Sequence, residues 1–189
     1  MFRARFIVFL LAGFLFSIPA APASAQEFSF FESGMAPGIA SLSVGGYNLR
    51  KTTGTGNKAA IFQLDLVPDF TLMRVDDWLY VHPYVGGWVT TDESRMAYGG
   101  LQALLVLAET LEFRPFVAVG PFAKGDGEDL KSDALFHAGG TMFYVSESGW
   151  RFGITLTHQS HGHLFSSSHS NPGAESLMFS VAVPFGKLL

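Results

Sequence analysis

The sequence predicts an all-β protein, an eight-stranded antiparallel transmembrane β-barrel. Eight strand-like stretches can be counted, an even number as in bacterial outer-membrane barrels. Most have the length of a tilted membrane strand, ~9 to 11 residues, and several alternate apolar with polar residues. No segment after the N-terminus has the ~20 apolar residues of a membrane helix. The longest comparable run, Leu101–Ala108, is too short, so any membrane insertion is expected to use a barrel.

The N-terminus has the form of a secretory signal peptide. Arg3 and Arg5 precede an apolar run over residues 6–16, and Ala23-Ser24-Ala25 is an A-x-A cleavage site. We expect residues 1–25 to be the signal peptide and residues 26–189 to be the outer-membrane barrel; an uncleaved membrane anchor is the alternative. The mature chain then has 16 acidic residues against 10 basic ones, which are the 12 of the full chain without Arg3 and Arg5. Nothing in this charge suggests a nucleic-acid partner, and the absence of cysteine excludes disulfides and thiol chemistry.

The first four stretches are predicted mainly from alternation. In the second, Phe62, Leu64 and Leu66 oppose Gln63 and Asp65, and similar patterns follow around residues 79–89 and 101–105. The fourth could also be helical over residues 101–110, but its short length and the preceding Gly99-Gly100 favour a strand. In chain order, the eight stretches are Ala40–Leu49, Ala59–Pro68, Trp78–Thr90, Met96–Ala108, Glu112–Phe122, Ala134–Ser146, Trp150–Ser160 and Ala174–Phe185.

The polar faces of these strands are expected to point into the lumen. Arg114, on the fifth strand, should join them near Asp65, because a buried charge is tolerable only when it is paired. Gly-Gly pairs within the strands should allow bends and close packing in a narrow barrel. Aromatic residues near strand ends would suit interfacial girdles; they are Trp78, Tyr80, Trp88, Tyr144 and Trp150.

The last two strands carry polar residues on their apolar faces. His158 and Ser160 share a face with Ile154 and Leu156, because side chains alternate along a strand. Glu175 likewise shares the apolar face of the eighth strand. A histidine two residues from a serine can act as its base, and a carboxylate can orient that histidine. This combination indicates a hydrolytic triad of Ser160, His158 and Glu175, provided that positions 158 and 175 lie opposite one another.

The connections predict which end of the barrel carries these residues. Short turns face the periplasm and longer loops face outside in such barrels. Residues 109–111 and 147–149 are tight, whereas most other connections are longer and polar; residues 69–77 are expected to be an unusually long turn on the periplasmic side. With a periplasmic N-terminus, His158, Ser160 and Glu175 reach the outer rim, at the level of the outer leaflet.

Two other interpretations of these residues stay open. In one, His158 and Glu175 are ordinary interfacial residues at strand ends and Ser160 begins a loop. In the other, a dense histidine cluster binds zinc, since imidazole is a common zinc ligand; its members would be His158, His161, His163 and His169.

The C-terminal region resembles the lipid A 3-O-deacylase family, whose members are also called acyloxyacyl hydrolase-like outer-membrane enzymes. The resemblance rests on His158-Gln159-Ser160-His161 and on residues 171–177 with the apolar strand that follows, about the last 30 residues. It implies a triad on the lipid-facing side of the barrel, with His158 as base, Ser160 as nucleophile and Glu175 as orienting acid. The family usually has asparagine after the serine, in a region implicated in oxyanion binding. Here that region contains His161 and Gly162.

The resemblance implies an outer-membrane serine esterase that removes the 3-O-linked acyl chain of lipid A and needs no cofactor. Its partner would be lipid A, or lipopolysaccharide, in the outer leaflet, and a homodimer stays open. The alternative is a noncatalytic small outer-membrane barrel with a structural or adhesive role.

Overall fold

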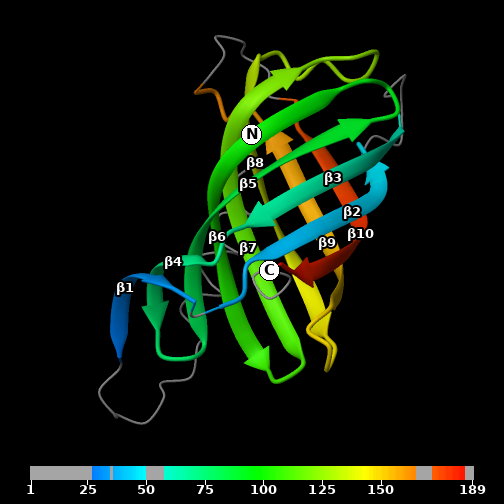
Figure 1. Cartoon of the computed structure of the whole chain (residues 1–189). Coiled ribbons are helices and arrows are strands. Elements are labelled where there is room, and N and C mark those ends of the chain that lie inside the picture. The colour runs from blue at the N-terminus through cyan, green and yellow to red at the C-terminus, as the bar shows by residue number, and fades with distance from the viewer. Residues whose placement is uncertain (1–26, 35, 50–57, 165–171, 186–189) are drawn as a thin grey trace, which may run out of the picture.

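Eight antiparallel strands close into a barrel (Figure 1). The computed structural model describes residues 27–34, 36–49, 58–164 and 172–185, and the predicted signal peptide lies outside this part of the chain. Within the described ranges, no helix is long and apolar enough to cross a membrane. The eight predicted strands are confirmed within about two residues at their ends; they are β2 (Ile39–Tyr47), β3 (Ala59–Val67), β5 (Leu79–Thr90), β6 (Arg95–Ala108), β7 (Leu111–Ala123), β8 (Ala134–Val145), β9 (Arg151–Ser160) and β10 (Ala174–Pro184).

The barrel is closed by pairing of β5 with both β3 and β6. One row of paired residues can be followed from Leu79 of β5 around all eight strands, and it returns to β5 at Val89, ten residues further along. This offset means that the strands are strongly tilted, as a closed barrel requires. Every residue of the row is apolar, and all of them except buried Leu105 are at least partly exposed on the outer wall, as suits contact with lipid. The row is Leu79, Leu105, Phe113, Met142, Ile154, Phe179, Val44, Phe62 and Val89.

The two rims of the barrel differ. The rim that carries the connections 91–94, 124–133 and 161–173 is called the loop rim below, and the opposite rim, with the tight turns 109–110 and 146–150, is called the turn rim. At the loop rim two connections are joined by hydrogen bonds, because the Asp126 N–H donates to the Asp92 carbonyl at 2.7 Å and the Gly125 N–H donates to Ser94 Oγ at 3.3 Å. β9 ends and β10 begins at the loop rim.

Two further strands, β1 (Phe28–Ser33) and β4 (Phe70–Val75), lie outside the closed ring. The prediction of a long turn over residues 69–77 was therefore wrong. β4 follows Pro68-Asp69 and pairs with the first residues of β5, and β1 pairs with β4. Proline removes a ladder hydrogen bond and Asp69 favours a turn, so the sequence shows the break after β3 but not the resumption of pairing beyond it.

The lumen is filled by polar side chains near the turn rim. Glu112 accepts from Arg114 Nε and Arg151 Nε, both at 2.9 Å, and Arg114 Nη1 donates to Gln102 at 3.2 Å. The inward direction predicted for Arg114 is confirmed, since its side chain is 2% exposed. The predicted partner was wrong, because Glu112, two residues away on the same strand face, pairs with Arg114 instead. Asp65 accepts from Tyr98 Oη at 2.7 Å and Gln63 Nε2 at 2.8 Å.

Aromatic rings close the middle of the lumen. His137 is fully buried and stacks on Tyr98 and Phe116, with ring centroids 4.4 and 5.1 Å apart. Of the aromatic residues predicted for interfacial girdles, Tyr144 and Trp150 are exposed on the outside near the turn rim. Trp88 and Tyr80 are buried, so their placement in a girdle was wrong. Both belong to the inward face of β5, where alternation aligns them with the lumen residues His82 and Tyr84.

Removing the charge of Glu112 should destabilise the barrel. Glu112→Gln leaves Arg114 and Arg151 buried together without a counter-charge, and breaking a buried pair in this way costs roughly 3–5 kcal/mol. Urea unfolding of the mature protein in lipid vesicles measures the change. The matched control is Glu147→Gln, which removes an exposed carboxylate from a tight turn at the same rim and should change stability by less than about 0.5 kcal/mol. Equal effects of the two variants would contradict the assigned role of Glu112.

Candidate functional site

Strand pairing places His158 opposite Glu175. Antiparallel β9 and β10 pair these two residues directly, with Ala174 opposite Gln159 and Ser176 opposite Thr157 on either side. His158 Nδ1 lies 3.5 Å from Glu175 Oε1. This distance allows electrostatic contact but is longer than a hydrogen bond. Residues 158 and 175 therefore face each other across the hairpin, as the triad interpretation requires.

Both side chains project from the outer wall of the barrel. Leu156 and Leu177, which neighbour them on the same strand faces, are 61% and 44% exposed. The alternate residues of β9 are buried in the lumen instead; Gln159 is fully buried and its Nε2 donates to Thr157 Oγ1 at 2.8 Å. His158 and Glu175 retain side-chain exposures of 39% and 28%. An imidazole and a carboxylate thus lie side by side where the apolar outer surface approaches the loop rim.

Ser160 ends β9 at the loop rim. It has the same strand parity as His158, two residues away, and its Cα pairs with Phe136 of β8. The exposure of the residue is only 9%, so its surroundings at the rim cover most of it. Successive residues of one strand face are about 7 Å apart along the strand, and a histidine side chain can bridge that separation.

The imidazole of His158 is held from two sides. Its Nδ1 edge faces Glu175, and its Cε1–Nε2 edge packs against Gly173, just before β10. A Cβ atom at position 173 would lie 3.0 Å from Nε2 and closer still to Cε1. Position 173 therefore has room for glycine alone unless the ring moves. Gly173 belongs to the segment 171–177 on which the family resemblance rests, but the sequence does not predict a role for it. Its contact with His158 depends on how β10 pairs with β9.

His161 and Gly162, the residues predicted for the oxyanion region, form the turn that follows Ser160. His161 is fully buried, and its Nδ1 accepts the N–H of His163 at 3.0 Å. Its carbonyl accepts the N–H of Leu164 at 3.0 Å. Gly162 has a φ of +57°, which favours glycine, and a Cβ atom added there would lie 3.3 Å from the ring of Phe136. The turn thus approaches the β8 residue that pairs with Ser160.

The alternative of a zinc site is not supported by the described residues. Within them, no three side chains of the metal-binding types lie close enough together to hold an ion. His169, the fourth histidine of that interpretation, lies outside the described ranges. His161 and His163 instead contact each other edge to face, with ring centroids 5.4 Å apart.

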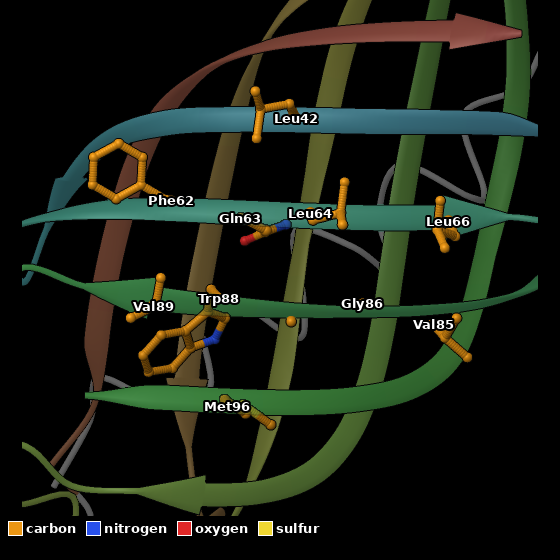
Figure 2. Close-up of a pocket in the computed structure, with 11 residues that line it drawn as sticks. Leu42, Phe62, Gln63, Leu64, Leu66, Val85, Gly86, Trp88, Val89 and Met96 are labelled. Atoms are coloured by element: carbon orange, nitrogen blue, oxygen red, sulfur yellow. The ribbon is translucent and has the colours of Figure 1, made fainter. Parts of the chain in front are cut away.

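A groove of about 580 Å³ lies elsewhere on the barrel wall (Figure 2). Its lining residues belong to β2, β3, β5 and the start of β6, whereas His158 lies on β9. Its lining is apolar except for Gln63, which is buried toward the lumen, and consists mainly of Leu42, Phe62, Leu64, Leu66, Val85 and Val89. The groove is therefore part of the lipid-facing band and not of the His158 site.

Comparisons with known proteins show similarity in structure. No protein-family model matches the sequence, and no curated protein matches it. The crystal structure of the outer membrane enzyme PagL is similar, with a TM-score of 0.56 and 17% identity over 78% of this chain and 99% of that chain. The Yersinia pestis outer membrane protein Ail, in a phospholipid nanodisc, has a TM-score of 0.43 and 12% identity over 77% and 99% of the two chains. The likeness to PagL shows that the chain has the fold of an outer-membrane barrel.

A methyl group at position 173 should displace the His158 ring. In Gly173→Ala the added Cβ meets Cε1 and Nε2, so the ring or the backbone must shift by a few tenths of an ångström or more. We expect the side-chain NMR resonances of His158 to move in the detergent-solubilised, folded barrel. The control is Gly99→Ala, where the nearest atoms lie 3.9 Å from the new Cβ. Unchanged His158 resonances in a folded Gly173→Ala protein would show that the ring does not pack on Gly173.

Proposed function

We propose that this protein is an outer-membrane serine esterase that hydrolyses the 3-O-linked acyl chain of lipid A. One observation carries the proposal: His158 and Glu175 face each other at 3.5 Å on the apolar outer wall, with Ser160 next on the same strand face. A charged carboxylate on the lipid side of a barrel is unfavourable, and an orienting role toward His158 gives a reason for its presence. The resemblance of the C-terminal region to lipid A 3-O-deacylases supports this choice of ester.

The lipid-facing position supports a lipid substrate. The site stands above an exposed apolar surface formed by Ile154, Leu156, Leu177 and Phe179. Acyl chains can lie on this surface without leaving the hydrocarbon layer, while the ester group stays at the level of the rim. Substrate would then reach the site by lateral diffusion in the leaflet, with no deep pocket and no cofactor.

The chemistry follows from the order of the groups. Ser160 Oγ bonds to the ester carbonyl carbon as His158 takes the hydroxyl proton on Nε2, the nitrogen away from Glu175. Glu175 stabilises the imidazolium at Nδ1, and the 3.5 Å separation would shorten as that charge forms. Collapse of the tetrahedral intermediate breaks the bond to the sugar oxygen, which receives the proton from His158. Water, activated by the same histidine, then releases the fatty acid and restores Ser160.

The oxyanion would be stabilised by the turn after Ser160. Because the His161 imidazole is buried and accepts a hydrogen bond within this turn, backbone N–H groups of residues 161 and 162 are the better candidate donors. Such donors do not depend on the side chain at position 161. The histidine found there in place of asparagine is then compatible with activity.

A noncatalytic structural or adhesive barrel is the second candidate. The low exposure of Ser160 and the hydrogen bonds that join the loops at residues 92–94 and 125–126 favour it. The two functions predict different fates for cellular lipid A.

Replacement of Ser160 should abolish deacylation. Mass spectrometry of lipid A from cells that express the wild type should show loss of one 3-linked hydroxyacyl group, and Ser160→Ala should lower the purified enzyme's rate at least about 10³-fold. Ser146→Ala, at the opposite rim, is the matched control and should retain activity. Unmodified lipid A with correctly inserted wild-type protein would favour the noncatalytic barrel.

The proposed mechanism also predicts insensitivity to chelators. Ser160, His158 and Glu175 need no metal ion, so deacylation by purified protein in detergent should change by less than about twofold after EDTA treatment. A large loss that Zn²⁺ restores would instead support a metal mechanism.

A further inference from the structure

The strands β1 and β4 form an annex to the barrel at the turn rim (Figure 1). β5 branches there: its first residues pair with β6 on one side and β4 on the other, whereas its later residues pair with β3. β1 is the terminal strand of this branch, and no strand of the described residues pairs with its other edge. The annex therefore adds an open sheet edge to a ring whose eight described strands each pair on both sides.

The outer face of the annex continues the apolar wall of the barrel. Phe30 pairs with Met73, which pairs with Val81 of β5, and Phe28 is connected through Val75 to Leu79 in the same way. Val81 and Leu79 belong to the lipid-facing side of β5. On this face Phe28 and Phe30 of β1 are exposed whereas Val75 of β4 is buried, so β1 supplies the exposed apolar surface of the annex.

Three phenylalanine side chains are exposed on β1. Phe28 and Phe30, 56% and 59% exposed, share one face of β1. Phe31, 73% exposed with a φ of +60°, has the alternate parity and stacks on Phe70 with ring centroids 6.5 Å apart. Exposed aromatic rings concentrated on one short strand mark a surface that contacts a partner or a membrane. In water it would expose apolar area together with a free strand edge, a combination that promotes aggregation.

The far end of the annex is acidic and polar. Glu27 and Asp76 exchange hydrogen bonds at 2.8 and 2.9 Å, and Asp77, whose side chain is 88% exposed, pairs with Arg74. These charges favour water at the tip. The annex thus passes from an apolar wall to a charged tip over the length of six-residue strands.

Two constraints define the layer in which the annex can lie. The open backbone edge of β1 cannot lie in hydrocarbon, because no water is present there to bind its N–H and C=O groups. The three phenylalanine rings are unfavourable in bulk water. The headgroup layer of a membrane satisfies both, since it is hydrated and still accepts aromatic side chains.

We infer that the annex is an interfacial anchor that binds the headgroup layer of the periplasmic leaflet of a phospholipid bilayer. Exposed Tyr144 and Trp150, near the same rim on β8 and in the turn before β9, complete the aromatic belt at this level. The inference rests on the membrane insertion assumed in the proposed function. Anchoring at the turn rim sets the depth of the barrel, and with it the height of the His158 site at the opposite rim.

Spin labels test this placement in the full mature protein. The chain has no cysteine, so single cysteines can be labelled with a nitroxide in protein folded into phosphatidylcholine–phosphatidylglycerol vesicles. Phe30→Cys reports on the annex. Its matched control in the lipid wall is Phe179→Cys, at a position of similar exposure (54%) in the middle of β10, and Asp77→Cys reports on the aqueous tip. Heat-modifiable gel mobility verifies that each variant is folded, and a label at Phe28 repeats the measurement with Phe30 intact.

The depth of each label is obtained from its relative accessibility to oxygen and to a water-soluble nickel chelate. We expect residue 30 to lie at a depth between those of residues 77 and 179, at the level of the lipid phosphates. Accessibility to nickel equal to that of residue 77 would place the annex in water and overturn the inference, and so would a depth equal to that of residue 179. Spectral broadening at residue 30 that is relieved by unlabelled protein would show a second copy on the β1 edge, which also overturns it. Because no activity is measured, a negative result leaves the esterase proposal untouched.

Discussion

The structure depends on the requirement that backbone polar groups within a membrane be paired by the protein itself. Eight strands satisfy it by forming a ring in which every strand has two neighbours. Closure fixes the register of all neighbours together, because the row of pairs that leaves β5 must return to it ten residues further along. A shift of one residue at any pair would exchange the lumen face and the lipid face of a strand. The position of His158 opposite Glu175 is a local result of this global constraint.

The barrel handles its charges differently on its two faces. In the lumen, Glu112 is paired with Arg114 and Arg151 by short hydrogen bonds, so the buried charges are compensated. On the outside, His158 and Glu175 are 3.5 Å apart, remain partly exposed and lie next to leucine and isoleucine. The first arrangement is what a stable interior requires. The second has no evident structural purpose, and this contrast supports the proposal of a site on the outer wall.

The annex is the exception to closure. β1 and β4 extend the sheet where only the beginning of β5 is available, and one edge remains open. The fold tolerates this edge at the turn rim, beyond the strands that form the closed wall. The two ends of the barrel therefore differ. The candidate site of His158, Ser160 and Glu175 lies at the loop rim, and the aromatic strand β1 lies at the turn rim.

Local periodicity determined most of the fold from the sequence alone. Alternation with period two assigns each side chain to one face, which is why the eight strands, the inward Arg114 and the outward His158 and Glu175 were predictable. Pairing between strands is not local, because it is decided by closure of the ring. Only the tertiary structure therefore decided that Arg114 meets Glu112, that Gly173 meets His158, and that residues 70–75 find a partner edge on β5.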